Sequence, residues 1–241
     1  PEPRRTLLAR WGDEVTPAWV PRRNQREPVR IWTGDLELHI TGDVAYAMWG
    51  YWQTTGDDAF LIDYGAEIIL DTARFWGSRV EWKPEKDRYE IANIVGPDEY
   101  HDRVDNNAFT NDLARWHLET AQAVWRWLEQ NHPARAAELA DKLNIRLETL
   151  SHWADVAARL YLPFDATTGL IEQFEGYFER RDVNLAEYEP RATSMQVLLG
   201  IEGVSQTQIL KQPDALMLFF MLRDRYDARA LRANWDYYVP R

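Results

Sequence analysis

Apolar residues recur at helical spacing along most of the chain. One stripe repeats every three or four positions and predicts an amphipathic helix, through Val44, Ala47, Met48, Tyr51 and Trp52. Residues 54–57 interrupt this stripe with side chains that cap helices. A second stripe follows, to about Arg79, through Phe60, Leu61, Tyr64, Ile68, Thr72, Phe75 and Trp76. The two stripes predict an antiparallel helix pair joined by a short connection.

The helical pattern stops between residues 82 and 97. Here Tyr89 and Ile91 alternate with Glu90 and Ala92, which predicts a short strand. The dipeptide Gly96-Pro97 is expected to end it.

Further helices are expected beyond this strand. Cap residues and prolines predict their positions: one capped by Asp105-Asn106, one beginning at Pro133, one over about 145–161, one beginning at Pro213 and one capped by Asp227. Residues 162–188 indicate loops with short strands. We count roughly seven or eight helices, with no linker that separates two domains. The pattern favours an all-α array or toroid over an α-solenoid, because a fixed repeat period is missing.

Composition and charge exclude several classes of protein. The chain has 241 residues and a net charge of −11, which argues against nucleic acid and anionic membranes as partners. With no cysteine it has no disulfide, thiol catalysis or cysteine-bound zinc. No apolar run approaches the length of a membrane span, and the charged run after Pro1 does not predict a signal peptide. These features are compatible with a cytoplasmic enzyme. The many aromatic rings are compatible with a homodimer.

The densest polar cluster is the heptapeptide GPDEYHD, residues 96–102. It lies on a predicted loop between a strand and a helix, where functional sites are common. Adjacent side chains in an extended chain point opposite ways, so only one of Asp98 and Glu99 is expected to face a given pocket. A carboxyl group beside rings such as Tyr100 can act as a general acid near neutral pH. The alternative is a helix-capping loop with solvated charges.

The same stretch contains oxygen and nitrogen ligands for a metal ion. However, His101, Asp102 and Asp105 match no metal-binding spacing, and the other four histidines are scattered, so we expect no metal site. The chain also lacks the phosphate-binding glycine loop, the dinucleotide-binding fingerprint and the nucleophile-elbow motif.

A second cluster surrounds Lys211, one of only four Lys among 28 basic residues. Lys211 and Gln212 precede the apolar helix that Pro213 is expected to begin. Because a helix N-terminus favours anions, an ammonium group there indicates an outside partner: a carboxylate, a phosphate or a sugar hydroxyl. The alternative is a surface Lys. Most of the 12 Trp are expected in the core, although such rings also stack on sugars.

Several long motifs occur in one order between about residues 34 and 238: ELHITGDVAYAMWGYW, IVGPDEYHDRVDNNAFTNDLARWHLETA, GLIEQFEGYF and QILKQPDALMLFF. Together they resemble the central domain of glycoside hydrolase family 65, which contains maltose, trehalose, kojibiose and nigerose phosphorylases and acid trehalases. The resemblance implies a glucoamylase-like (α/α)6 toroid, or an incomplete part of one, with short β-strands in its loops. Residues 34–241 are then part of the catalytic domain, and residues 1–33 are a divergent segment leading into the barrel.

The resemblance also implies roles for three residues. Glu99 is implied as the general acid that protonates the glycosidic oxygen, and Lys211 and Gln212 as the residues that hold the glucosyl unit in the −1 subsite. No metal or organic cofactor is implied, and inorganic phosphate is the co-substrate. The implied reaction is the inverting phosphorolysis of an α-glucosidic disaccharide to β-glucose 1-phosphate and a free sugar.

Two alternatives stay open at this point: inverting hydrolysis, as in acid trehalases, and an inactive carbohydrate-binding fragment. A hydrolase needs a second carboxylate to activate water, whereas phosphate is already an anion. In the family, a stretch that binds phosphate follows a segment like residues 234–238, and this chain ends at Arg241. We therefore expect a fragment of the catalytic domain, or a shortened relative.

Overall fold

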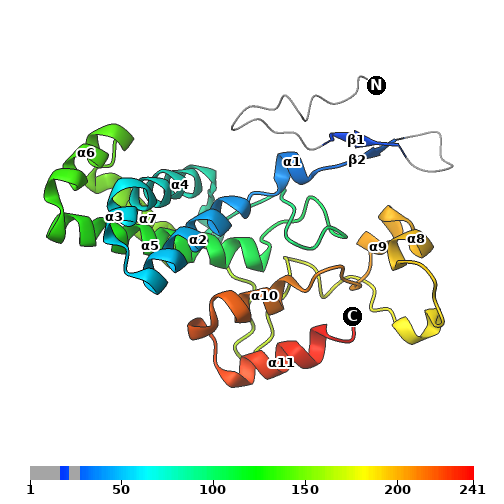
Figure 1. Cartoon of the computed structure of the whole chain (residues 1–241). Coiled ribbons are helices and arrows are strands. Elements are labelled where there is room, and N and C mark those ends of the chain that lie inside the picture. The colour runs from blue at the N-terminus through cyan, green and yellow to red at the C-terminus, as the bar shows by residue number, and fades with distance from the viewer. Residues whose placement is uncertain (1–16, 22–27) are drawn as a thin grey trace.

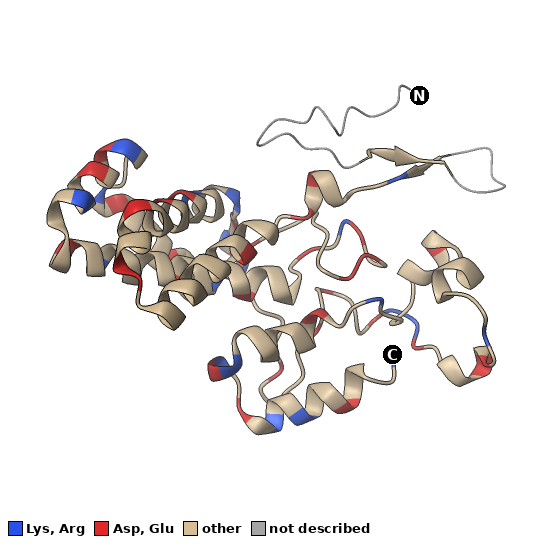
Figure 2. Ribbon diagram, in the orientation of Figure 1, with Lys and Arg blue, Asp and Glu red and all other residues tan. Residues whose placement is uncertain are grey.

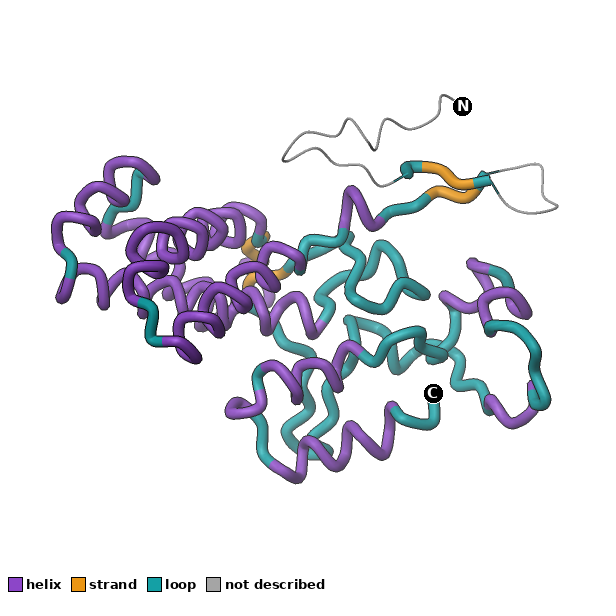
Figure 3. Tube along the Cα trace, viewed as in Figure 1, coloured by secondary structure: helices purple, strands orange, loops and turns teal. Residues whose placement is uncertain are grey.

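The computed structural model describes residues 17–21 and 28–241 of the chain. Its helices are α1 (Thr33–Leu36), α2 (Ile40–Thr55), α3 (Asp58–Phe60), α4 (Ala66–Arg79), α5 (Ala108–Asn131), α6 (Pro133–Leu143), α7 (Leu147–Arg159), α8 (Met195–Leu199), α9 (Ile201–Ser205), α10 (Asp214–Met221) and α11 (Ala228–Tyr238). Its strands are β1 (Trp19–Val20), β2 (Val29–Arg30), β3 (Glu81–Lys83) and β4 (Arg88–Glu90). The helices α2 to α7 gather on one side, whereas long loops and short helices occupy the other (Figures 1 and 3).

The expected helix pair is present. α2 ends at Gly56, whose φ of +67° is the left-handed conformation that glycine adopts readily. Asp57 then caps the next helix by accepting a hydrogen bond from the backbone N–H of Phe60 at 3.0 Å. From α3 this helix continues through a π-helical turn (Leu61–Gly65) into α4. The predicted break is confirmed at Gly56 and Asp57, whereas Thr54 and Thr55 still belong to α2.

The longest helix, α5, begins at Asn107, whose side chain accepts a hydrogen bond from the N–H of Thr110 at 2.9 Å. The prediction that Asp105-Asn106 caps this helix is wrong. Asn106 has a φ of +51°, and its side-chain oxygen accepts from the N–H of Ile91 at 3.2 Å instead. The loop therefore continues through a left-handed residue at Asn106, and the helix starts one residue later than predicted.

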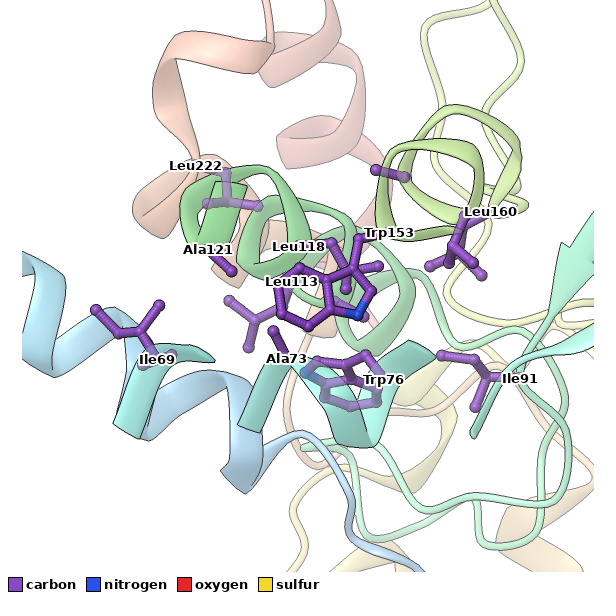
Figure 4. Close-up of a cluster of buried hydrophobic side chains, with 14 of the residues drawn as sticks. Ile69, Ala73, Trp76, Ile91, Leu113, Leu118, Ala121, Trp153, Leu160 and Leu222 are labelled. Carbon is purple, nitrogen blue, oxygen red and sulfur yellow. The ribbon is translucent and has the colours of Figure 1, made fainter. Parts of the chain in front are cut away.

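The main core lies where α4, α5 and α7 pack against one another (Figure 4). Trp76 of α4 and Trp153 of α7 are 0% and 1% exposed, so these two large rings are almost entirely removed from water. The indole N–H of Trp76 donates to His117 Nδ1 at 3.0 Å, which gives the buried ring a polar partner. Large rings buried among aliphatic side chains are what hold these helices together.

The strand predicted around Tyr89 is β4, which pairs antiparallel with β3. The hydroxyl of Tyr89 donates to Asp155 of α7 at 2.8 Å, so the hairpin is tied to the helical core. A second hairpin, β1 with β2, precedes α1. The short strands thus lie in the segments outside the helices, as expected.

The last part of the chain alternates loops with helices. α6, α7 and α11 match their predictions, with Pro133 in the first turn of α6 and Asp227 as the N-cap of α11. α10 starts at Asp214, one residue after Pro213. A small second core lies under the loops, formed by Met195, Val204 and Ile209 with Tyr100, Val183, Leu185, Tyr188 and Leu199 around them. The short helices α1, α8 and α9 were not predicted, because four or five residues cannot show a helical repeat.

The expectation of a mainly α fold is confirmed, and the consecutive helix pairs are consistent with a portion of an (α/α)6 toroid. In the described part of the chain no helix has the length and apolar character needed to cross a membrane. Acidic and basic side chains are distributed over both the helical side and the loop side (Figure 2).

Candidate active site

Two loops meet beside the N-terminal ends of α5 and α10 (Figure 1). The first connects β4 to α5 and carries residues 96–101, and the second connects α9 to α10 and carries Lys211 and Gln212. Two backbone hydrogen bonds between Ile94 and Val104, of 3.0 and 2.9 Å, close the base of the first loop. The closed base directs the polar motif toward the second loop.

Asp98 and Glu99 point in opposite directions, as the alternation of side chains predicts. The side chain of Asp98 is 2% exposed, whereas that of Glu99 is 46% exposed. Glu99 lines a cavity of about 480 Å³ together with Trp32 and Asp102. Of the two adjacent carboxyl groups Asp98 and Glu99, a ligand in this cavity can therefore reach that of Glu99.

The ammonium group of Lys211 lies beside this carboxyl group. Lys211 Nζ donates to Glu99 Oε1 at 2.9 Å, and both side chains are more than two-fifths exposed. The sequence analysis expected an outside partner for Lys211, whereas in the structure its ammonium group contacts a carboxylate of its own chain. Because exposed ion pairs contribute little to stability, the pair matters chiefly for where it holds the two groups.

Gln212 lies next to Lys211 and is partly buried. Its side-chain oxygen is buried and has no hydrogen-bond partner within the described residues. Buried polar atoms usually have a partner, so this acceptor is available to a donor that the chain does not supply. The structure thus brings together the three residues that the sequence singled out: Glu99, Lys211 and Gln212.

Asp98 joins the two loops from the buried side. Its Oδ1 accepts from the backbone N–H groups of Lys211 at 2.9 Å and Gln212 at 3.4 Å. Its Oδ2 accepts from Gln173 Nε2 at 3.1 Å and lies 2.6 Å from His101 Nδ1. An ionised carboxylate has enough lone pairs for all these donors.

His101 is buried against Asp98. Its Nε2 lies 2.8 Å from the carbonyl oxygen of Thr207, which can only accept, so this nitrogen carries a proton. The 2.6 Å contact between Nδ1 and Asp98 Oδ2 holds the other edge of the ring. The rings of Phe174 and Tyr177 pack against the imidazole, with centroids 5.0 and 6.0 Å away. Packing and hydrogen bonds together hold His101 in one orientation.

A second buried carboxyl group, Asp214, lies close to Asp98 at the start of α10. Its Oδ2 accepts from Asn107 Nδ2 at 2.7 Å, and its N–H donates to Gln173 Oε1 at 3.1 Å. Complete burial, and then the charge of Asp98, raise the pKa of Asp214 well above its usual value. Burial therefore favours the neutral form of the Asp214 carboxyl group.

Gly96 lets the first loop approach this cluster. A Cβ atom at this position would lie 2.4 Å from Asn107 Nδ2 and 2.5 Å from Asp214 Oδ2. Such distances are too short for any side chain without a shift of the loop or its partners. Glycine is thus needed here for close approach.

The sequence analysis did not single out Gln173, Thr207 or Asp214 as parts of this site. Gln173 lies within the motif GLIEQFEGYF, but nothing in that motif shows that its amide contacts Asp98. Asp102 was considered only as a metal ligand; it lines the cavity with Glu99, and burial raises its pKa. Within the described part of the chain, no group of three or more His, Asp or Glu is placed to hold a metal ion.

The comparisons with known proteins identify the family. The profile of the Glycosyl hydrolase family 65 central catalytic domain matches residues 3–241. The chain belongs to glycoside hydrolase family 65. The resemblance predicted from the motifs is confirmed.

Relatives within family 65 include several phosphorylases. A kojibiose phosphorylase of Caldanaerobacter subterraneus subsp. tengcongensis is 42% identical over 95% of this chain and 30% of that protein. A 1,2-alpha-glucosylglycerol phosphorylase of Bacillus selenitireducens is 38% identical over 98% of this chain and 31% of that protein. An alpha,alpha-trehalose phosphorylase of Thermoanaerobacter brockii is 34% identical over 86% of this chain and 27% of that protein. The chain thus spans about 30% of the length of the first of these relatives.

The fold also matches that of a solved family structure. A protein described as a kojibiose phosphorylase from the human microbiome superimposes with a TM-score of 0.75 at 24% identity, over 83% of this chain and 29% of that one. This match supports the fold.

Proposed function

We propose that this chain is part of an inverting disaccharide phosphorylase, in which Glu99 is the general acid. The observation that carries the proposal is the placement of Glu99 on a cavity, with the ammonium group of Lys211 at 2.9 Å. Relatives that act as phosphorylases on kojibiose, 1,2-alpha-glucosylglycerol and alpha,alpha-trehalose support the reaction type. The substrate class is an α-glucoside, and the co-substrate is inorganic phosphate.

In the proposed reaction, Glu99 donates its proton to the glycosidic oxygen as the bond from this oxygen to the anomeric carbon breaks. A phosphate oxygen attacks the anomeric carbon from the opposite face, so the configuration inverts. The products are β-glucose 1-phosphate and the free sugar. Because phosphate is already an anion, a second carboxylate is not required to activate the nucleophile.

Lys211 and Gln212 are proposed to hold the glucosyl unit. The ammonium group of Lys211 has three N–H donors and lies beside the carboxyl group of Glu99. The side-chain oxygen of Gln212 has no partner among the described residues. Hydroxyl groups of a sugar both donate and accept, so they match this combination of ammonium donors and amide acceptor. The cavity lined by Trp32 and Asp102 beyond Glu99 is where the departing sugar is proposed to lie.

The reaction is tested by product analysis. The purified protein is incubated with kojibiose, trehalose, nigerose or maltose, with and without phosphate, and both glucose 1-phosphate and glucose are measured. We expect glucose 1-phosphate from at least one sugar, only when phosphate is present. Glucose formed without phosphate would instead indicate hydrolysis, and sugar binding without either product would indicate a carbohydrate-binding protein.

The role of Glu99 is tested by Glu99→Gln, which keeps the shape of the side chain but removes the transferable proton. We expect phosphorolysis to fall by at least about 10²-fold, the usual contribution of general acid catalysis. Glu129→Gln is the matched control, because Glu129 is exposed on α5 and far from the two loops in the chain. Near-normal turnover of Glu99→Gln would exclude Glu99 as the acid.

A further inference from the structure

Asp98 is adjacent to Glu99 in the chain, yet it turns away from the cavity and has no part in the reaction proposed above. Its side chain is 2% exposed and is surrounded by hydrogen-bond donors. Three of these are the backbone N–H groups of Tyr100, Lys211 and Gln212, at 3.3, 2.9 and 3.4 Å. Backbone N–H groups cannot rotate away as side chains can. The conformation of the two loops therefore depends on a hydrogen-bond acceptor at the position of the Asp98 carboxylate.

The segment around Lys211 needs such an acceptor. Residues 208–213 belong to neither a helix nor a strand, so the hydrogen bonds of a helix or sheet do not satisfy the N–H groups of Lys211 and Gln212. Irregular backbone that is partly buried must find other partners. Asp98 provides them for two consecutive residues, although 113 positions separate it from Lys211 in the chain.

The other side of the carboxylate is held just as firmly. Gln173 Oε1 accepts from the N–H of Asp214 at 3.1 Å, which fixes the amide so that its Nε2 faces Asp98. His101 is fixed in turn by the carbonyl oxygen of Thr207 at 2.8 Å. The carboxylate of Asp98 is therefore held in one orientation. Through its hydrogen bonds to the N–H groups of Lys211 and Gln212, it holds the backbone of these two residues in place as well.

We propose that Asp98 is a positioning residue, which locks the backbone of Lys211 and Gln212 to the loop that carries Glu99. The lock sets the side chain of Lys211 so that its ammonium group reaches both the Glu99 carboxyl group and the glucosyl unit. This inference rests on the proposed roles of Glu99, Lys211 and Gln212. It assigns the two neighbouring carboxyl groups different tasks: Glu99 transfers the proton, and Asp98 positions the residues that hold the sugar.

The variant Asp98→Asn tests the lock. It keeps one acceptor oxygen but places an amide N–H₂ against either the two backbone N–H groups or the fixed amide of Gln173. We expect kcat/KM for the disaccharide to fall by about ten-fold or more, because small displacements of groups that hold a substrate have large effects. The loss should divide between KM and kcat in the same proportion as it does in Lys211→Met.

A double-mutant cycle then shows whether Asp98 acts through Lys211. In the Lys211→Met background, Asp98→Asn should lower kcat/KM by less than about two-fold, since the side chain that the lock positions is already gone. Equal losses in both backgrounds would overturn the proposal. The matched control is Asp105→Asn, because Asp105 accepts from the N–H of Asn93 at 2.8 Å in the same loop. Its effect should be the same with and without Lys211.

Two further measurements test the proposal if Asp98→Asn folds poorly or if the protein shows no activity. His101→Gln retains the Asp98 carboxylate but loosens its orientation, and it should couple to Lys211→Met with the same sign. Hydrogen exchange of residues 208–213 does not depend on activity. We expect the amides of Lys211 and Gln212 to exchange at least about ten-fold faster in whichever variant is folded, because a partly buried hydrogen bond is lost or weakened. Unchanged exchange would overturn the lock whatever reaction the protein catalyses.

Discussion

The helical side and the loop side of the molecule are stabilised in different ways. Around Trp76 and Leu113, α4, α5 and α7 pack through aliphatic and aromatic side chains that are entirely buried. Between α9 and α10, and between β4 and α5, the chain is irregular and is held by buried polar side chains: Asp98, His101, Asn106, Asn107, Gln173, Thr207 and Asp214. The difference follows from the backbone. Helices satisfy their own N–H and C=O groups, whereas loops need side chains to do so.

This contrast separates what determines stability from what determines activity. Apolar packing is non-directional and grows with buried area, so the helical side should carry most of the free energy of unfolding. Hydrogen bonds to buried carboxyl and amide groups are directional, so the loop side should determine how accurately Glu99 and Lys211 are placed. Each prediction below tests this division.

The largest expected effect is on the helical side, for Trp76→Ala. Removing a ring that is 0% exposed leaves a cavity and takes away the donor to His117, so unfolding should become easier by about 3–5 kcal/mol. Urea denaturation measures this change, with Trp235→Ala, 54% exposed on α11, as the control. Phosphorolysis per folded molecule should stay within about two-fold. A large loss of activity at unchanged stability would contradict the view that the helical side determines stability and the loop side determines activity.

His117 is a buried titratable side chain of this core. Burial lowers its pKa to about 4 from 6.5. The hydrogen bonds agree with a neutral ring, because Nδ1 accepts from Trp76 and Nε2 donates to the carbonyl oxygen of Ile69 at 2.9 Å. Below pH 6.5 the unfolded chain binds a proton that the folded protein does not. The stability from neutral His117 is therefore complete above this pH and is lost as the pH falls toward 4.

Over this window the loss should reach about 3 kcal/mol, at about 1.4 kcal/mol for each pH unit. The measurement is the free energy of unfolding between pH 7.5 and 5.5, in the wild type and in His117→Gln. The variant should show the flatter dependence on pH. His152→Gln, a change of an exposed histidine, should leave the wild-type slope intact. Parallel curves for the wild type and His117→Gln would show that His117 does not resist protonation.

On the loop side, Gly96→Ala should disturb the site more than the fold. The added methyl group would lie 2.4 Å from Asn107 Nδ2 and 2.5 Å from Asp214 Oδ2, so the loop must shift. We expect a loss of about 1–3 kcal/mol in stability, with a fall of at least about ten-fold in kcat/KM. Gly50→Ala is the control, because nothing lies within 4 Å of a Cβ on Gly50 in the middle of α2. That change should stabilise the helix by about 0.5–1 kcal/mol and leave activity unaltered.

The two sides also differ in how far the sequence predicts them. The helices could be predicted, because a packed helix repeats its apolar residues at a regular spacing and begins at recognisable residues such as Asp57 and Asp227. The opposite directions of Asp98 and Glu99 followed from local geometry in the same way. In both cases the signal lies within a few neighbouring residues.

The loop side could be predicted only in part. Asp105, Asn106 and Asn107 are all good cap residues, so residue type could not select Asn107; the left-handed turn at Asn106 did so. The contact between Asp98 and Gln173 joins residues 75 positions apart, and no local pattern reports it. Motifs shared with family 65 indicated Glu99, Lys211 and Gln212, but the buried residues that position them became visible only in the structure.

The smallest expected effect concerns the cap of α11, which lies on the loop side but follows helical rules. Asp227 accepts from the N–H of Ala230 at 2.7 Å. Asp227→Ala leaves this N–H without its partner, so stability should fall by about 1 kcal/mol, whereas Asp227→Ser should restore most of it. Thermal denaturation of the two variants measures the difference, with Asp236→Ala, a change in an exposed ion pair of the same helix, as the control. Because Tyr237 of α11 donates to Gln208 at 2.5 Å, a fall in phosphorolysis beyond the loss of folded protein would show that α11 also helps to position the second loop.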